Sequence, residues 1–247
     1  MIWLTLPAGA LLFAWPLLAG GQTPFLLALV VAMVVVELLA RRLDARHLAL
    51  LAGICAVDSA LRLALVTGIA GFSPVFFLIL VAGWSLGARF GFASGAMALV
   101  TSAIVTGGVG PWLPYQIFAA GWVGVAGALA RRAGGDRLWL LAAIGAVTGY
   151  LFGALMDIWD WTTFYRGSAG FGFLPGLPPG ELAWRFLRFY VSTSAAYDSF
   201  RAIGNALMVL LIGRPVIATL ERFRERLEFR IVDRREPATA EVGSTSK

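Results

Sequence analysis

Three residue types that support most site chemistry are nearly missing from this chain. Among 247 residues there is one cysteine, Cys55, one histidine, His47, and one lysine, Lys247. A single cysteine excludes an internal disulfide and a site with several thiolates, and one cysteine plus one histidine cannot assemble a usual zinc site. A terminal lysine excludes a P-loop and a Schiff base. The chain is therefore not an ATPase by itself, and we expect no metal site.

Charged residues are scarce as well. They make up 14% of the chain against 59% hydrophobic residues, and the mean hydropathy is +0.81, whereas soluble domains are about 25% charged. Because a spanning helix needs about 20 apolar residues, the sequence predicts an all-α, polytopic membrane helix bundle of about eight transmembrane helices. The predicted spans are 3–20, 24–40, 47–67, 72–88, 91–107, 114–131, 137–157 and 186–213.

The arginines indicate how the spans are oriented. Cytoplasmic loops are enriched in Lys and Arg, and the basic clusters sort to one side if both termini are cytoplasmic. These clusters are Arg41, Arg42, Arg46, Arg89, Arg131, Arg132, Arg137 and the run from Arg214 to Arg235. The net charge of +6 is therefore a topology signal, and no nucleic-acid partner is expected. Met1 to Gly21 lacks a basic n-region, which favours a spanning helix over a signal peptide.

The part after the last predicted span has a different pattern. Apolar residues at helical spacing alternate with arginines over 214–235, which predicts a cytoplasmic amphipathic helix. Residues 236–247 read as a disordered tail.

Three ladders of small residues would let helix backbones approach closely in lipid. They are Ala52/Ala56/Ala60, Gly91/Gly95 and Gly145/Gly149/Gly153. Each ladder predicts either packing inside the bundle or a docking surface for another membrane subunit. The alanine ladder is the best candidate for docking.

A few polar residues fall inside predicted spans, where charges are costly and are paired or functional. Asp58 and Arg62 are spaced i, i+4, and Asp198 and Arg201 are spaced i, i+3, so each pair shares a helix face. Arg62 and Asp198 are also candidates to pair with each other. Asn205 continues the Asp198 face, and this set is expected to form the floor of a ligand cavity or a clamp between helices.

Two connections on the predicted outer side are rich in aromatic residues. The first, from Gly107 to Gln116, is uncharged and carries Trp112, Tyr115 and Gln116. The second is expected to run from Asp157 to Gly180 as one long loop, and it contributes Asp157, Trp159, Trp161 and Tyr165. Aromatic side chains with a few polar groups suit a mostly apolar ligand captured from outside.

The stretch from about His47 to Phe229 resembles the substrate-binding S components of energy-coupling factor (ECF) vitamin transporters. Four segments carry the resemblance: the alanine ladder, the turn from Gly83 to Phe92, Gly110-Pro111-Trp112-Leu113-Pro114-Tyr115-Gln116, and the run from Asp198 to Asn205. The second and third are the more specific. The chain departs from the family pattern in its two additional helices within residues 1–46.

This resemblance implies a six-helix substrate-binding core over 47–213 that binds a vitamin and works with a transmembrane coupling subunit and two ATPase subunits. The alanine ladder would dock to the coupling subunit. The segment around Trp112 looks most like the cobalamin-type S components, so cobalamin is the favoured ligand, ahead of smaller vitamins or their precursors. The implied location is a bacterial or archaeal cell membrane, with no resident cofactor and no catalytic residues.

Two other classes remain open at this stage. One is a membrane enzyme that uses Asp157, Asp160 or Asp198 on a lipid or isoprenoid substrate, although such enzymes have denser clusters of acids, histidines or lysines. The other is an autonomous secondary transporter or channel, which needs intramembrane polar residues on several helices.

Overall fold

The computed structural model describes residues 2–19, 24–41, 43–65 and 75–228. Within these ranges it is all-helical, apart from an isolated bridge between Arg166 and Phe173. A short 3-10 turn over Ile2–Leu4 is followed by α1 (Thr5–Leu18), α2 (Phe25–Ala40), α3 (Ala45–Leu65), α4 (Val75–Leu86), α5 (Ala88–Thr106), α6 (Leu113–Gly134), α7 (Leu138–Thr163), α8 (Pro179–Thr193) and α9 (Ala195–Glu228). The predicted tail and residues 229–235 lie outside the described residues.

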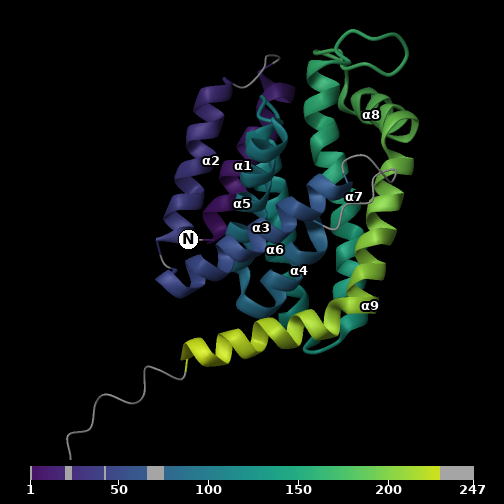
Figure 1. Cartoon of the computed structure of the whole chain (residues 1–247). Coiled ribbons are helices and arrows are strands. Elements are labelled where there is room, and N and C mark those ends of the chain that lie inside the picture. The colour runs from purple at the N-terminus through teal and green to yellow at the C-terminus, as the bar shows by residue number, and fades with distance from the viewer. Residues whose placement is uncertain (1, 20–23, 42, 66–74, 229–247) are drawn as a thin grey trace, which may run out of the picture.

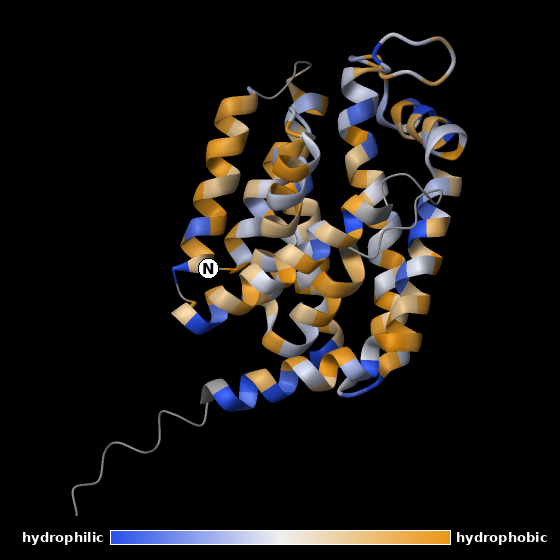
Figure 2. Ribbon diagram, viewed as in Figure 1, coloured by the Kyte–Doolittle hydropathy of each residue, from blue (hydrophilic) through white to orange (hydrophobic). Residues whose placement is uncertain are grey.

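Four of these helices are long and apolar enough to cross a membrane, which indicates a multi-pass membrane protein. They are Ala88–Thr106, Leu113–Gly134, Leu138–Thr163 and Ala195–Arg226. Shorter apolar helices cover Ile2–Leu18, Phe25–Ala40 and Phe76–Leu86. The prediction of an all-α bundle is confirmed, and Figure 2 shows hydrophobic residues along most of the helix length.

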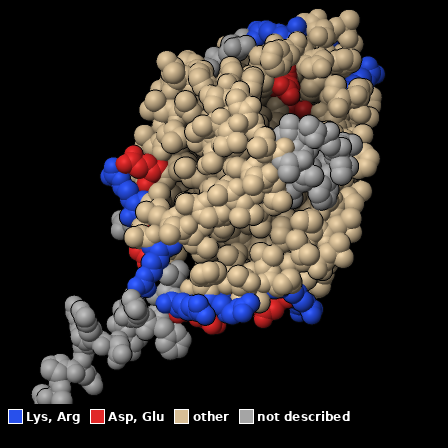
Figure 3. Space-filling model, viewed as in Figure 1, with Lys and Arg blue, Asp and Glu red and all other residues tan. Residues whose placement is uncertain are grey.

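Two ends of the bundle differ in composition. The arginine end holds the start of α3, the α4–α5 junction, the α6–α7 turn and the second half of α9. The loop end holds the α5–α6 connection, the segment 164–178 and α8 (Figure 1). At the arginine end, Asp44 Oδ1 accepts hydrogen bonds from the first amides of α3, those of Arg46 and His47, at 3.0 and 2.9 Å. Basic side chains, with a few acidic ones, line this edge in Figure 3, and most of the visible surface above them is uncharged.

The predicted span 186–213 is wrong, because the helix breaks at Ser194. The run Ser192-Thr193-Ser194 combines residues whose hydroxyls compete with helical hydrogen bonds. Thr193 Oγ1 donates to the carbonyl of Phe189 at 2.8 Å, and Ser194 Oγ donates to Asp157 Oδ1 on α7 at 2.8 Å. The break turns 179–193 into a separate amphipathic helix, α8, and leaves α9 to begin at Ala195.

The last predicted span and the predicted amphipathic helix belong to one helix. α9 continues without interruption from Ala195 to Glu228, with Pro215 inside it. Proline removes one helical hydrogen bond and kinks the helix, and Figure 1 shows α9 changing direction to run along the arginine end. The basic segment is therefore the second arm of a bent helix.

The centre of the bundle is a contact between backbones. A Cβ atom on Gly91 of α5 would overlap the carbonyl of Gly124 on α6, and a Cβ on Gly83 of α4 would overlap the same carbonyl. Only glycine allows three helices to meet this closely. The Gly91/Gly95 ladder and the motif that begins at Gly83 are thus explained by packing within the bundle.

The N-terminal helices pack closely on the remaining bundle. Phe13 of α1 makes an edge contact with Tyr115 of α6, with ring centroids 5.1 Å apart. Trp122 Nε1 donates to Thr5 Oγ1 at 3.3 Å. α2 buries Ala28, Ala32, Val36 and Leu39 in the hydrophobic core, where it contacts α5 and α6. α1 and α2 are therefore integrated into the bundle's core.

Candidate functional site

The alanine ladder of α3 lies on the surface. Ala52, Ala56 and Ala60 are all exposed, and so is Gly53, where an added Cβ would meet nothing within 4 Å. The opposite face of α3 buries Leu51, Ile54 and Cys55 in the core. This ladder therefore does not take part in packing within the described bundle, and it presents a row of small side chains next to the exposed Val57.

The glycine ladder of α7 is occupied by α9. A Cβ on Gly153 would overlap the carboxylate of Asp198, and a Cβ on Gly149 would come within 3.1 Å of the Ala202 backbone. Gly145 lies against Asn205. Of the two roles that the sequence allows for these ladders, the α7 ladder has the first, which is packing within the bundle. The α3 ladder has no contact of this kind among the described residues and is exposed.

Asp198 lies at the centre of a polar network between α7, α8 and α9. Its carboxylate pairs with Arg201, which confirms the predicted i, i+3 pair, and it accepts a hydrogen bond from the Tyr190 hydroxyl at 3.0 Å. Burial raises the pKa of the Tyr190 phenol, and Asp198 raises it further, so this hydroxyl stays protonated and donates. The sequence does not predict the contact of Tyr190 with Asp198, because the two residues lie on opposite sides of the helix break.

Arg201 is enclosed from several sides. Its side chain is 11% exposed, and its Nη1 also donates to the carbonyl of Gly149 at 3.4 Å. The guanidinium lies over the rings of Phe76, Phe152 and Tyr197, 4.9–5.8 Å from their centroids. Such cation–π contacts compensate partly for lost hydration. The arrangement is that of a clamp joining α4, α7 and α9.

Two other predicted residues extend this network but keep unused acceptors. Asn205 donates through Nδ2 to the carbonyl of Gly145 at 3.4 Å, while its Oδ1 is buried without a partner in the described part of the chain. Asp157 accepts from Ser194 through Oδ1, and its Oδ2 is likewise buried and unpartnered. Buried acceptors without partners are costly in a protein interior.

The predicted pairing of Asp58 with Arg62 is not found as a hydrogen bond. Asp58 is fully buried, and neither carboxylate oxygen has a hydrogen-bond partner among the described residues. Arg62, in the last turn of α3, lies near Asp58 and near Tyr197 and Arg201 of α9. The alternative pairing of Arg62 with Asp198 is not found either, because Asp198 is held by Arg201 and Tyr190.

A first aromatic cluster closes the loop end between α1, α6 and α7. Trp112 folds over Gly110 and donates to the carbonyl of Gly108 at 3.1 Å. Its ring centroid is 5.8 Å from that of Trp159, and Tyr115 is 6.2 Å from Trp159. Tyr115 is only 2% exposed. Trp112 and Tyr115 are thus brought together with Trp159. Trp112 and Gln116 are half-buried, and Tyr115 lies inside the core.

A second aromatic cluster is separate from the first. Trp161 lies two residues beyond Trp159 on α7, which places it on nearly the opposite face of the helix. Its Nε1 donates to the carbonyl of Phe171 at 2.6 Å, and its ring contacts Phe173 and Phe186. Tyr165 and Phe189 pack into the same cluster, 4.7 Å apart. The aromatic residues of the predicted site therefore form two groups.

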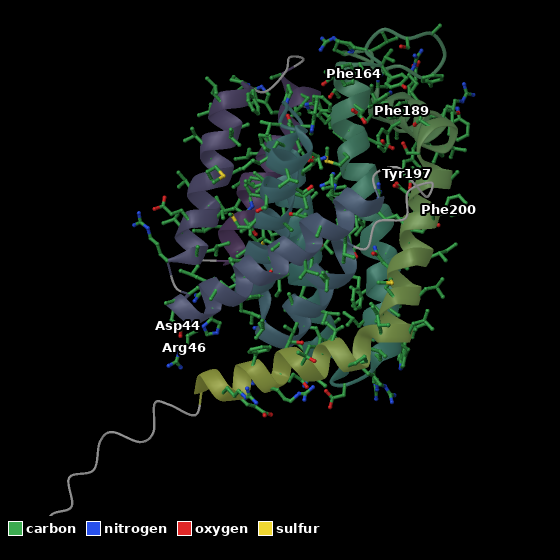
Figure 4. The ribbon with its side chains drawn as sticks, viewed as in Figure 1. Asp44, Arg46, Phe164, Phe189, Tyr197 and Phe200 are labelled. Carbon is green, nitrogen blue, oxygen red and sulfur yellow. The ribbon has the colours of Figure 1, made fainter. Side chains whose placement is uncertain are left out.

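The expected loop from Asp157 is shorter than predicted, because α7 continues to Thr163. Asp157, Trp159 and Trp161 are helical residues for this reason. Figure 4 shows Phe164, Phe189, Tyr197 and Phe200 along one side of the molecule, away from Asp44 and Arg46 at the arginine end.

A groove of about 390 Å³ at the loop end was not predicted. It is lined by Gly170, Phe171, Trp184, Leu187, Arg188, Val191 and Ser192. The apolar spacing of Trp184, Leu187 and Val191 is the sequence signal for it, but Leu187 and Val191 fall within the predicted span 186–213.

The comparisons with known proteins give no match: no family model, no curated protein and no solved structure is similar to this chain. Among the described residues, no three His, Cys, Asp or Glu side chains lie close enough together to hold a metal ion.

Proposed function

We propose that this chain is the substrate-binding membrane subunit of an ECF-type ABC importer. In this proposal the arginine end faces the cytoplasm with both termini, and the loop end faces outside. A six-helix core over 47–213 follows two additional membrane helices, giving about eight spans in a bacterial or archaeal cell membrane.

The observation that carries the proposal is the open alanine ladder of α3. The described glycine contacts between α4, α5 and α6 and between α7 and α9 are filled inside the bundle, whereas Ala52, Ala56 and Ala60 are exposed together. In lipid, a face of small side chains favours close approach of another helix. A transmembrane coupling subunit that carries two ATPases is the partner that the S-component resemblance implies.

We propose cobalamin as the vitamin, captured at the loop end. Trp112 and Gln116 are half-buried there, and Phe164 is 67% exposed. Aromatic faces with an amide suit a large, mostly uncharged ligand that has an apolar face and an amide rim. Arg201 is already held by Asp198, which makes it a poor partner for the carboxylate of a small anionic vitamin.

Calorimetric titration of the purified full chain with cobalamin tests this proposal. We expect binding without ATP or partner subunits, and an affinity about tenfold lower for Trp112→Ala, because an aromatic face is lost. The matched control is Trp139→Ala, which removes an exposed tryptophan from the start of α7, at the arginine end.

The outcomes separate the ligand from the class of protein. Tight binding of riboflavin or a thiamine precursor, with no heat from cobalamin, would overturn the choice of vitamin and keep the transporter proposal. No binding of any of these vitamins would contradict both.

A further inference from the structure

α8 has two apolar sides, and only one of them packs against the protein. Its inner side joins the second aromatic cluster through Phe186 and Phe189. Its outer side carries three apolar residues at the i, i+3, i+7 spacing of one helix face. They are Trp184, Leu187 and Val191, which are 54%, 47% and 62% exposed. The groove at the loop end lies along this outer side, and nothing in the vitamin-import proposal makes use of it.

The length of α9 places α8 at one boundary of the membrane. The first arm of α9 runs from Ala195 to Gly213 and is followed by the charged Arg214. At about 1.5 Å per residue this arm is about 28 Å long, which matches a hydrocarbon thickness of about 30 Å. With Arg214 at one boundary of the hydrocarbon, Ser194 lies at the other. α8 ends at this second boundary, beside the start of α9 (Figure 1), and is therefore at the level of the lipid headgroups.

Exposed apolar residues also continue onto α9, just after α8 ends. Phe200, Ile203, Leu207 and Leu211 are exposed at helical spacing along the membrane-spanning arm, and Figure 2 shows hydrophobic residues on both helices. Apolar surface of this extent is uncommon on a protein face that meets water. In a multi-pass membrane protein, the row on α9 faces acyl chains. The outer side of α8 extends this lipid-facing surface to the headgroup level.

One basic side chain lies at the edge of the groove. The Arg188 guanidinium is 5.1 Å from the centroid of the Trp184 ring. Arg188 is exposed and makes no ion pair with a described residue, whereas Arg185 pairs with Glu181 at 3.1 Å. Tryptophan is enriched at membrane–water interfaces, and arginine binds phosphate oxygens with its planar fork of donors. The groove thus places a cation beside apolar side chains, as a phospholipid places a phosphate beside acyl chains.

We propose that the groove holds a phospholipid of the leaflet at the loop end. Its phosphate lies at Arg188, and the start of an acyl chain lies on Trp184, Leu187 and Val191. α8 then runs along the membrane surface as an interfacial amphipathic helix. This assignment depends on the multi-pass character of the chain. It does not depend on the vitamin or on which end faces the cytoplasm.

Spin labels test which medium the outer side of α8 faces. Nitroxides are attached at Leu187→Cys and Val191→Cys in a Cys55→Ala background, which removes the chain's one cysteine. The full chain is reconstituted into vesicles of phosphatidylglycerol and phosphatidylcholine. We expect dissolved oxygen, which concentrates in hydrocarbon, to relax both labels several-fold more than a water-soluble nickel chelate does. Two exposed positions serve as controls: Leu211→Cys on the spanning arm of α9, and Ala169→Cys in the segment 164–178.

Three results would overturn the proposal. If the nickel chelate reaches the α8 labels as well as it reaches the Ala169→Cys label, the groove faces water. If neither reagent relaxes the α8 labels, another protein or a second copy of this chain covers the groove. If added cobalamin shields the α8 labels, the groove belongs to the vitamin site.

Native mass spectrometry of the delipidated full chain with added phosphatidylglycerol tests the position of the phosphate. We expect Arg188→Gln to retain several-fold less lipid than wild type, because the phosphate loses its cation. The matched control is Arg166→Gln, since Arg166 is also exposed and lies over an aromatic ring, that of Phe173, but does not line the groove. This control keeps wild-type retention. Equal retention by the two variants, or no lipid bound to wild type, would contradict the proposal.

Discussion

The absence of a side chain at Gly153 allows α7 to approach α9 closely. An added methyl group would overlap the Asp198 carboxylate, which is itself held by Arg201 and Tyr190. The carboxylate cannot move aside without breaking the charge pair inside the bundle. Breaking a buried pair by losing one partner costs several kcal/mol.

We therefore predict that Gly153→Ala lowers stability by about 1–3 kcal/mol, the usual cost of overpacking. Thermal unfolding of the purified protein in detergent measures the change. The matched control is Gly53→Ala on α3, where the new methyl group meets nothing and the helix gains stability. Equal melting temperatures for the two variants would show that the α7–α9 contact is looser than described.

Residue-level prediction from local spacing succeeded for one charge pair and not for the other. The Asp198–Arg201 pair follows from i, i+3 spacing on a single helix, and it is present. The burial of Tyr115 could not be predicted, because it depends on Phe13 from a helix far away in the sequence. Asp58 and Arg62 have favourable i, i+4 spacing, yet they form no hydrogen bond.

At the scale of elements, α3 exposes a row of small side chains on one face. That face is the alanine ladder, and we propose that it docks to the coupling subunit. A leucine there would hold a neighbouring helix away without disturbing the core, since Ala56 is exposed.

We predict that Ala56→Leu leaves vitamin binding unchanged and reduces vitamin uptake by cells at least tenfold, because close helix approach requires small side chains. The control is Ala143→Leu, the same change at an exposed alanine of α7. Normal uptake by a stably expressed Ala56→Leu protein would contradict the proposal that the alanine ladder docks to the coupling subunit.

Helices were predicted correctly in kind and less well in their boundaries. Hydropathy alone carried α7 only to Asp157, although the helix runs to Thr163. It also merged α8 with the next span, because the break at Ser194 depends on hydroxyl hydrogen bonds, one of which reaches α7. Pro215 was read as a boundary, whereas α9 bends there and continues.

At the scale of the whole molecule, the two ends carry different chemistry. Aromatic clusters and the α7–α8–α9 network occupy the loop end, while arginines gather at the opposite end. The all-α bundle and its multi-pass character were predictable from composition. The partner, the vitamin and the orientation in the membrane stay predictions.

The most direct test of the central claim is affinity purification of the tagged full chain from its native membrane in mild detergent, followed by identification of the copurifying proteins. The account predicts one transmembrane coupling subunit and two ATPase subunits in stoichiometric amounts with the chain. Recovery of the chain without any ATPase, from membranes in which those subunits are present, would contradict it.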